Sequence, residues 1–547
     1  MNNYRDVLFS VINAANTYKN KTIVMLVNKI NGAYPISKSS GDFHRLANHL
    51  YQLLHSARHD DISDKSVKYL SSAAESKTSE PMAAPSKSEK SVITFPNVFT
   101  GTSKDVKVKT PKWKIGKPLT KDFMSTKVNN MLTSIVLAET ETTKLAGLEN
   151  LISYIKQHPD ARHIAVKEGA ISTLLSVRKR TKTHYIHCAL KEALALLGHA
   201  DPVRGKGIRI LSIDGGGTRG ILVIEMLRKL EELSGKPVYE MFDLICGVST
   251  GAIIGTLMGL KQHTLDEVSE IYRRISSQVF TQSPLRGTSN LVWSHSYYDT
   301  DLWEKLLSEQ WGNKTLIETA RNLKCPKFCA VSAVVNHSRL VAYVFRNYSL
   351  PCKVQSQYMG DCVHAVWEAV RASAAAPTYF EEFKIGNMIH QDGGILVNNP
   401  TAVAIHEAKL LWPCTPIQCV VSFGTGRTSL NPIDFSEPAI ANNTSWKNKF
   451  FAIIDSATDT EGIHIMLSDL LPADVYYRFN PYLTEMLEMT EINPQKLDQL
   501  EKDALMYLRR NEDKFQQVTR KLGESKGLWQ RLMEWLALRR QLHNLKL

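Results

Sequence analysis

After residue 120 the apolar positions of the chain follow two different patterns. From about Thr120 to Ala200 they recur with helical spacing, which predicts helices over 145–157, 163–180 and 184–198. The lengths of these helices and their short turns suit a pair of armadillo- or HEAT-like repeats. Because two repeats are too few for a free solenoid, we expect this block to dock on a larger domain.

From Ile208 onward, short apolar runs end in glycine-rich turns and alternate with helical stretches, which predicts a mainly parallel α/β sheet. The expected elements are helices over 266–280, 361–375 and 401–412 and strands over 328–336, 341–348 and 417–426. We therefore place the helical block at 120–203, an α/β domain at 204–430 and a helical C-terminal region that covers this domain at 431–547.

The first 119 residues divide into two segments. Residues 1–60 hold short apolar runs, and the first forty residues carry five Lys/Arg and one acid, Asp6. This segment is compatible with an organelle transit peptide or with an ordinary amphipathic element. Residues 61–119 are rich in Ser, Lys, Pro, Thr and Glu, which predicts a disordered basic linker. Six lysines between Lys104 and Lys117 surround Trp113 and form either a solvated stretch or a membrane-surface patch.

The composition fits a large intracellular protein. The formal charge of +13 permits nucleic acid or an anionic membrane as a partner. The eight cysteines show no CxxC spacing and read as free thiols of a reducing compartment. The most apolar stretch, Leu244 to Leu260, contains a glycine-rich turn and reads as a buried strand, turn and helix rather than a membrane span. No secretory signal is evident at the N-terminus.

Two glycine-rich turns flank one predicted helix between Ile208 and Gly255. The second turn, Gly247-Val-Ser249-Thr-Gly251, matches the G-x-S-x-G nucleophile elbow, in which a strand turns sharply into a helix with a serine at its apex. A side chain at Gly247 or Gly251 would collide with the neighbouring strand or helix. The pattern therefore predicts an exposed nucleophile at Ser249.

The first turn, Asp-Gly-Gly-Gly-Thr-Arg-Gly at 214–220, leaves the backbone amides of Gly215, Gly216 and Gly217 uncovered before a helix N-terminus. Beside a nucleophilic serine, such amides can hold the oxyanion of an acyl-transfer intermediate, and Arg219 adds positive charge. The same turn also satisfies the dinucleotide fingerprint G-x-G-x-x-G. That fingerprint requires an acid after the second strand, whereas Asp243 precedes it. An NAD(P)-binding oxidoreductase thus stays an alternative.

A carboxylate that could serve as the base stands in the turn Asp392-Gly393-Gly394. The ordered motifs DGGGTRG, GVSTG and DGG, with SAAAPTYF before the last one and NNP after it, resemble the patatin-like phospholipases over 208–427. The resemblance implies a three-layer α/β/α hydrolase domain and a Ser249–Asp392 dyad without a catalytic histidine. We accordingly expect His406 and His464, which follow Asp392, to play structural roles.

The resemblance further implies a phospholipase A2-type enzyme that releases a free fatty acid and a lysophospholipid without a metal or another cofactor. Its expected partner is the surface of a phospholipid membrane rather than nucleic acid. Mitochondrion, endoplasmic reticulum and peroxisome are the candidate sites, although the terminal Leu-Lys-Leu differs from the peroxisomal Ser-Lys-Leu signal. A helical-repeat scaffold with an inactive hydrolase domain is the second alternative. The oligomeric state stays open.

The last predicted helix begins near Leu528 and combines leucines and tryptophans with arginines. Leu528, Leu532, Trp535, Leu542 and Leu545 have helix-compatible spacing, and Trp529 lies beside them. Such a basic amphipathic helix can lie in a membrane interface or pack on its own domain. We expect it to bind vesicles together with the lysines at 104–117.

Overall fold

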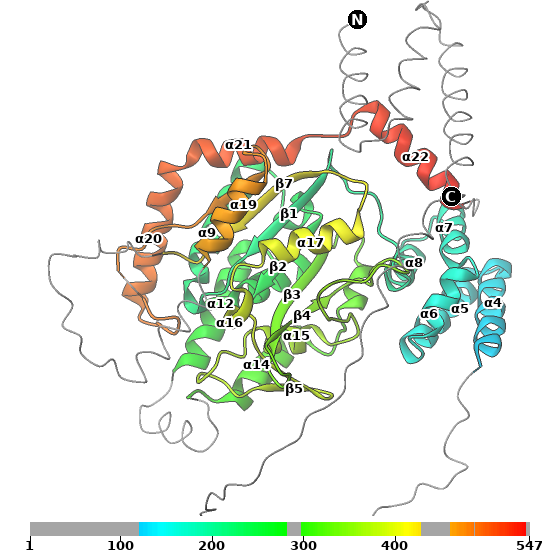
Figure 1. Ribbon diagram of the computed structural model, residues 1–547, viewed down its shortest axis with the longest axis horizontal. Helices are drawn as coiled ribbons and strands as arrows, with labels where there is room; N and C mark the ends of the chain where they lie inside the picture. Colours follow the sequence, from blue (N-terminus) through cyan, green and yellow to red (C-terminus); the bar gives the residue numbers. More distant parts are fainter. Residues whose placement is uncertain (1–119, 282–296, 428–459, 486, 543–547) are drawn as a thin grey trace, which may run out of the picture. The chain divides into compact units, whose positions relative to one another are not determined.

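The computed structural model describes residues 120–281, 297–427, 460–485 and 487–542 (Figure 1). The chain divides into two units, Met1–Lys109 and Thr110–Leu547, and all described residues belong to the second unit. The expectations for residues 1–60, for the lysines and Trp113 of the linker, for Leu545 and for the terminal tripeptide therefore fall outside the described residues.

A mixed eight-stranded sheet forms the centre of the described chain, in the order β5-β6-β3-β2-β1-β7-β8, with β4 also paired to β3. The strands are β1 (Ile208–Ile213), β2 (Leu244–Val248), β3 (Lys327–Val334), β4 (Val341–Arg346), β5 (Phe383–Ile385), β6 (Met388–Asp392), β7 (Ile417–Phe423) and β8 (Tyr476–Phe479). The pairs β3–β2, β2–β1, β1–β7 and β7–β8 are parallel, whereas β4, β5 and β6 pair antiparallel. The prediction of a mainly parallel sheet is thus confirmed.

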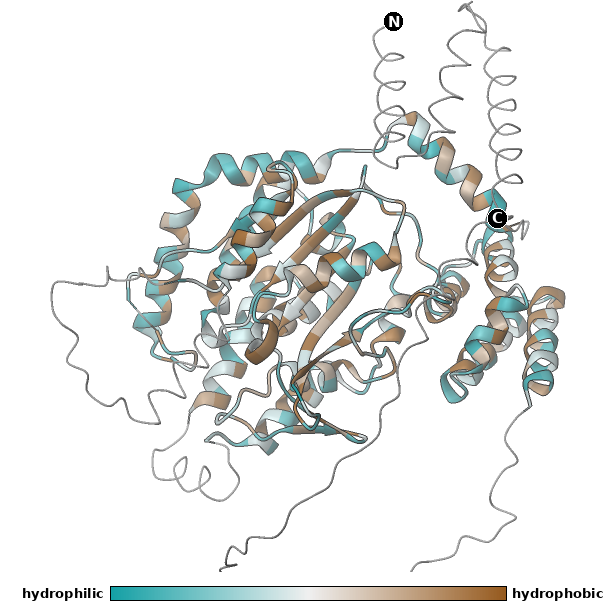
Figure 2. Ribbon diagram, in the orientation of Figure 1, coloured by the Kyte–Doolittle hydropathy of each residue, from teal (hydrophilic) through white to brown (hydrophobic). Residues whose placement is uncertain are grey.

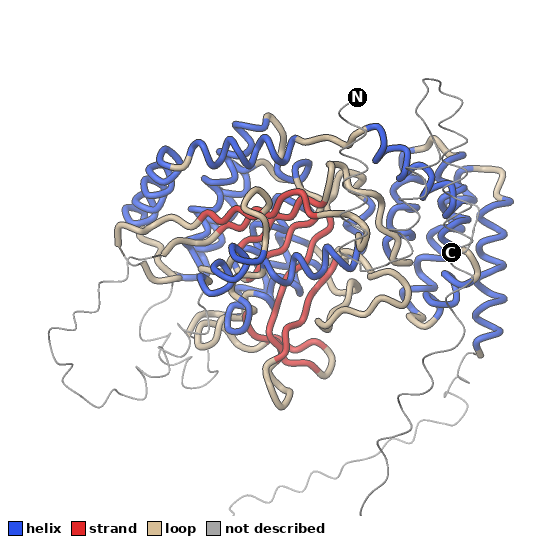
Figure 3. The backbone as a smooth tube through the Cα atoms, turned by 45° about the horizontal axis from the view of Figure 1, so that its top comes forward, coloured by secondary structure: helices blue, strands red, loops and turns tan. Residues whose placement is uncertain are grey.

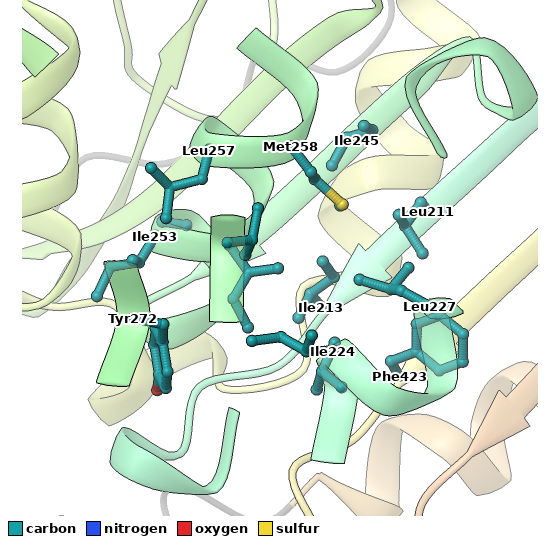
Figure 4. Close-up of a cluster of buried hydrophobic side chains, with 14 of the residues drawn as sticks. Leu211, Ile213, Ile224, Leu227, Ile245, Ile253, Leu257, Met258, Tyr272 and Phe423 are labelled. Atoms are coloured by element: carbon teal, nitrogen blue, oxygen red, sulfur yellow. The ribbon is translucent and has the colours of Figure 1, made fainter. Parts of the chain in front are cut away.

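Both faces of the sheet are buried under helices, which confirms the expected three-layer α/β/α arrangement (Figure 3). On one face, Leu211, Ile213 and Ile245 pack with residues of α9 (Gly220–Ser234), α11 (Thr250–Gly255) and α12 (Leu265–Phe280), as the side chains in Figure 4 show. On the other face, Ile210 and Cys246 pack against α17 (Thr401–Leu411) and α19 (Glu461–Leu470). Because successive side chains of a strand point to opposite faces, continuous apolar runs are needed here, and Figure 2 shows much of the central strands in brown.

The remaining helices of the first face are α10 (Val238–Met241), α14 (Thr300–Trp311), α15 (Val366–Ser373), α20 (Pro494–Arg510) and α21 (Glu512–Gly523), and the short α16 (Gly394–Val397) follows β6. Local sequence defines several helix ends. Thr264 and Glu267 form a reciprocal capping box at the start of α12, and Gly235 ends α9 in the left-handed conformation at φ 64°. α15 is shorter than the predicted helix over 361–375.

The helical block consists of α4 (Lys121–Leu137), α5 (Glu141–Gln157), α6 (Ala161–Lys167), α7 (Ala170–Arg180) and α8 (His184–Leu196). The helix predicted over 163–180 is divided because Gly169 adopts φ 83° between α6 and α7. The block has its own apolar core, which includes Ile317 and Ala320 of the 3-10 turn Ile317–Arg321. Fully buried Glu192 of α8 forms ion pairs with Lys156 and with Arg321 of that turn. The block therefore packs on the α/β domain as expected; its assignment as armadillo-like repeats stays a prediction.

The described part of the region after residue 431 is largely helical, but it also contributes one strand to the sheet. Its described part holds α19, α20, α21 and α22 (Leu528–Leu542), but also β8, which pairs parallel with β7 and extends the sheet. β8 is only four residues long and is buried at every position, so it has no periodicity that could separate it from a helical segment. The sheet thus takes a strand from beyond the boundary expected at residue 430.

Candidate active site

β2 and β6 meet end to end on the same edge of β3. β4 pairs with β3 over Cys329–Val334, so β2, which pairs over Lys327–Val331, must lie on the opposite edge. β6 pairs with Ser332–Val334, residues that also pair with β4, so β6 must lie on the opposite edge from β4. This is the edge of β3 along which β2 ends. Because β6 runs antiparallel to β3, its last residue, Asp392, points toward the end of β2. Ser249 follows that end directly.

Ser249 stands at the sharp bend between β2 and α11. Its backbone has φ 53° and ψ −117°, a strained conformation for a residue with a side chain. A Cβ atom on Gly247 would overlap the backbone of Gly251, and one on Gly251 would overlap the carbonyl of Ile213. These two approaches let strand, turn and helix come close enough to leave Ser249 half-buried at the apex.

Asp392 is 6% exposed, so its carboxylate is buried. The amide of Gly394 donates to Oδ1 at 2.7 Å, and the end of β6 brings the carboxylate toward Ser249. Burial raises the pKa of Asp392 to about 6, although the Ser249 side chain and the Gly394 amide favour the charged form. At neutral pH the carboxylate is therefore mostly ionised and has more proton affinity than an exposed aspartate, which suits a general base.

The first glycine-rich turn lies directly beside the nucleophile. A Cβ atom on Gly215 would come within 3.3 Å of Cβ of Ser249. Hydroxyl groups hold two carbonyls of this turn: Thr425 Oγ1 donates to Gly215 at 2.7 Å, and Thr250 Oγ1 donates to Gly217 at 2.8 Å. Tyr272, buried on α12, also donates its hydroxyl to the carbonyl of Gly217. The turn is thus held from three separate elements.

The orientation of these carbonyls determines where the amides point, because N–H and C=O of a trans peptide point in opposite directions. Arg219 Nε donates to the carbonyl of Gly216 at 3.2 Å, so this side chain orients the turn from behind. The amide of Gly215 donates to the carbonyl of Asn398 at 3.4 Å. Within the described residues, no group accepts a hydrogen bond from the amides of Gly216 and Gly217. Of the three glycines expected to hold an oxyanion, these two keep their donors available.

Two contacts to this turn come from the C-terminal region and were not anticipated from the sequence. Arg478 of β8 forms a buried ion pair with Asp214, the first residue of the turn, at 2.6 Å. The carbonyl of Met489 accepts a hydrogen bond from the amide of Thr218 at 2.8 Å. A Cβ atom on Gly217, which has φ 57°, would overlap Met489, so only glycine fits there. No local signal marks these contacts, because their residues lie far apart along the chain.

The histidines considered from the sequence are engaged away from the dyad. His406 of α17 interacts with Ser356 Oγ at 3.2 Å, and His464 of α19 interacts with the hydroxyl of Tyr476 at 3.3 Å. His390, two residues before Asp392, is fully buried and interacts with Ser332 Oγ at 2.9 Å. None of these contacts involves Ser249 or Asp392.

Asp243 does not stand where a dinucleotide site would need it. Its carboxylate forms a bidentate, buried ion pair with Arg209 at 3.0 and 2.8 Å. This pair lies at the amino end of β2, whereas the glycine-rich turn follows the carboxyl end of β1. Asp243 therefore lies too far from the turn to accept a hydrogen bond from the ribose of a dinucleotide bound there, which argues against the oxidoreductase alternative.

Comparison with known proteins places this site in a family. Residues 211–405 match the model of the patatin-like phospholipases. The chain is 46% identical over 403 residues to calcium-independent phospholipase A2-gamma of Oryctolagus cuniculus, an alignment that covers 73% of this chain and 50% of that protein. It is 45% identical over 424 residues to the protein of the same name of Homo sapiens, with 76% and 53% coverage.

A plant relative is more distant: phospholipase A I of Arabidopsis thaliana is 31% identical over 473 residues, which cover 74% of this chain and 35% of that protein. The chain spans about half the length of the phospholipase A2-gamma relatives it matches. The two glycine-rich turns, the serine and the aspartate all lie inside the matched range and on one end of the sheet. Residues 211–405 of this chain therefore form a patatin-like phospholipase domain.

Proposed function

We propose that this chain is a lipid acyl hydrolase of the phospholipase A2 type, which releases a free fatty acid and a lysophospholipid from glycerophospholipids. The observation that carries the proposal is the placement of Ser249 and the buried carboxylate of Asp392 at the facing ends of β2 and β6, beside two backbone amides without an acceptor in the described residues. The names of the relatives, phospholipase A2-gamma and phospholipase A I, support the same substrate class.

In the proposed reaction, Asp392 accepts the proton of Ser249 while the serine oxygen attacks the ester carbonyl. The amides of Gly216 and Gly217 donate to the oxyanion that forms. Arg219 holds the peptide group between these two glycines in place. Collapse of the intermediate expels the lysophospholipid, which takes the proton from Asp392. Water, deprotonated by Asp392, then attacks the acyl-enzyme; the bond to the serine oxygen breaks, the fatty acid leaves, and Asp392 returns the proton to Ser249. Each step uses groups of the chain alone, so we propose an activity that needs neither calcium nor another cofactor.

Replacement of the two dyad residues tests the proposal. Ser249→Ala and Asp392→Asn should each abolish hydrolysis of phosphatidylcholine in mixed vesicles, while circular dichroism and the melting temperature show a folded protein. The wild type should keep its activity in EGTA and should react with a fluorophosphonate probe, as the Ser249→Ala variant should not. Full hydrolysis by Ser249→Ala would contradict the proposed nucleophile. A wild type that neither hydrolyses lipid nor reacts with the probe would instead favour the inactive-scaffold alternative.

We further propose that the protein meets its substrate as a peripheral protein, with the carboxyl end of the sheet toward the bilayer. Ser249 and Asp392 lie at that end, and large apolar side chains there are exposed: Leu396 of α16 by 39%, Met489 by 37% and Ile465 of α19 by 61%. Asn399, just beyond α16, donates to the carbonyl of Thr460 at 3.2 Å, which brings the start of α19 to the same end. Among the described helices, none has the length and apolarity needed to cross a bilayer.

α22, which the sequence suggested as a membrane helix, lies at the other end of the sheet. Gln530 donates to the carbonyl of Lys206, two residues before the amino end of β1, at 2.6 Å. Leu538 and Leu542 pack partly on the helical block, whereas Leu528 is 86% exposed. A bilayer on α22 would thus face away from the dyad, so we assign the lipid contact to the opposite end. The proposed site of action is intracellular, at mitochondrial, endoplasmic reticulum or peroxisomal membranes, and the free state of the eight cysteines supports a reducing compartment.

A further inference from the structure

The ladder between β2 and β3 is interrupted at the point where the nucleophile elbow begins. Val248 stands opposite Val331 in this parallel pair. In a continued ladder, the amide of the next residue, Ser249, would donate to the carbonyl of Val331. Instead, the amide of Ser249 donates to Ser373 Oγ at 2.9 Å, and Ser373 Oγ donates to the carbonyl of Val331 at 2.6 Å. One hydroxyl is thus inserted between the two strands.

This insertion satisfies both backbone groups while it holds the strands apart. Ser373 is the last residue of α15 and is fully buried, and its single proton is committed to Val331. Its oxygen can therefore only accept from Ser249. A buried amide without a partner costs about 1–3 kcal/mol, so the bridge stabilises the strained backbone of Ser249 in the position where β2 has already left the ladder.

The backbone of the same residue holds the other member of the dyad. The carbonyl of Ser373 accepts a hydrogen bond from the amide of Gly393 at 3.2 Å, and the carbonyl of Ala375 accepts one from the amide of Asp392 at 2.9 Å. A Cβ atom on Gly393 would overlap the carbonyl of Val331, so the aspartate turn rests on the bridged peptide itself. The end of α15 therefore touches both strands whose ends form the site.

We propose that Ser373 is a positioning residue, whose hydroxyl bridge between Ser249 and Val331 sets the placement of the nucleophile relative to Asp392. The proposal rests on the proposed hydrolase function. Without the hydroxyl, β2 and β3 can close into a direct hydrogen bond, which would draw Ser249 toward Val331 and away from its working geometry. A displacement of about 1 Å at a reacting group can cost about 100-fold in rate.

Kinetics of Ser373→Ala test the proposal in the full chain. We expect kcat to fall by about 10- to 100-fold with KM within about threefold of the wild type, because substrate contacts are unchanged. The rate of fluorophosphonate reaction at Ser249 should fall by a similar factor. Ser373→Cys, which keeps a weaker donor and acceptor, should lie between the wild type and Ser373→Ala, and it serves as the readout if Ser373→Ala does not fold.

The matched control is Ser349→Ala. Ser349 is also buried, and its hydroxyl interacts with Cys362 at 3.4 Å, but it has no contact with the dyad. This variant should lose stability without loss of kcat. A kcat of Ser373→Ala within twofold of the wild type, or a Ser373→Cys variant that is no better than a folded Ser373→Ala, would overturn the proposal. If the wild type reacts with the probe but hydrolyses no lipid, the function proposal fails, and the probe rates of the same variants still decide the role of Ser373.

Discussion

The guanidinium of Arg478 lies 2.6 Å from the carboxylate of Asp214, and both side chains are buried behind the glycine-rich turn. Arg478 also donates to Ser422 Oγ of β7 at 3.0 Å, so one side chain joins β8, β7 and the residue that begins the turn. Since Asp214 leads directly into Gly215, the pair supports the peptides proposed to bind the oxyanion. A side chain of β8, the last strand, thus stabilises the glycine-rich turn that follows β1, the first strand.

Arg478→Met should destabilise the protein and also reduce its turnover. Removal of one partner of a buried pair leaves an uncompensated charge and costs about 3–5 kcal/mol. Arg209→Met is the matched control, because Arg209 forms an equally buried pair with Asp243 at the opposite end of the sheet. Thermal unfolding should show similar losses for the two variants, whereas kcat measured below the unfolding transition should fall only for Arg478→Met. Equal activity of both variants would show that the Arg478 pair has only a structural role.

The rate should increase with pH through about 6. Burial raises the pKa of Asp392 to about 6, and only the ionised carboxylate can accept the proton of Ser249. A pH profile of kcat/KM on one lipid substrate should therefore show a rising limb centred near pH 6 and a plateau above it. Burial also raises the pKa of Asp214 to about 6. The limb should persist in Asp214→Asn if Asp392 is its source; loss of the limb in that variant would assign it to Asp214.

Asp392→Asn should be more stable than the wild type at pH 7.5. The pKa of Asp392 in the folded protein lies above its ordinary value of 3.8, so the protonated form stabilises the fold below pH 4 and this contribution is lost as the pH increases through 6. A shift of about two units corresponds to at most about 3 kcal/mol, which the neutral amide would recover. Melting temperatures at pH 4 and 7.5 check this: the two proteins should differ at pH 7.5 and converge at pH 4. A lower melting temperature of Asp392→Asn at pH 7.5 would contradict the burial argument.

His406→Ala and His464→Ala should retain most of the activity. Both imidazoles interact with Ser356 and Tyr476, respectively, rather than with the dyad. Steady-state rates on vesicles should change by less than about tenfold, in line with local packing losses. A decrease of more than about 1000-fold for either folded variant would restore a Ser–His–Asp triad.

Vesicle binding should depend on α19 more than on α22. Ile465→Ser removes an exposed side chain of α19, whose exposed fraction is 61%, and should weaken binding and interfacial hydrolysis together. Trp529→Ser combined with Trp535→Ser on α22 should leave hydrolysis at the vesicle surface unchanged. Flotation assays and initial rates on the same vesicles measure both effects. The reverse order would return the membrane contact to α22, as its sequence first suggested.

The sequence was sufficient for the parts of the site that depend on local geometry. Gly247, Gly251 and Ser249 could be assigned because a strand-to-helix bend requires those residue types at those spacings. The paired strands β3 and β4 and the helix α17 were equally visible from their apolar patterns. Local order of this kind is encoded within a few residues, so it can be read without knowledge of the fold.

The supporting contacts could not be predicted in this way. Arg478 lies 264 residues from Asp214 in the chain, on a strand of four residues that carries no period. Ser373 is the single serine of the helix predicted over 361–375, and only the fold shows that its hydroxyl lies between two strands. From the sequence we expected the amide of Gly215 to donate to the oxyanion. Only the structure shows that this amide already donates to the carbonyl of Asn398.

The end-to-end meeting of β2 and β6 on one edge of β3 bears on how activity arises during synthesis. The elbow belongs to neighbouring segments, β1, α9 and β2, which can assemble soon after they leave the ribosome. The proposed base, Asp392, is positioned only when β6, which is synthesised later, pairs with the part of the β3 edge beyond β2. Strand pairing between segments far apart in sequence is slow. A nascent or truncated chain that ends before β6 would thus hold the proposed nucleophile without the proposed base, and we expect it to be inactive toward lipids.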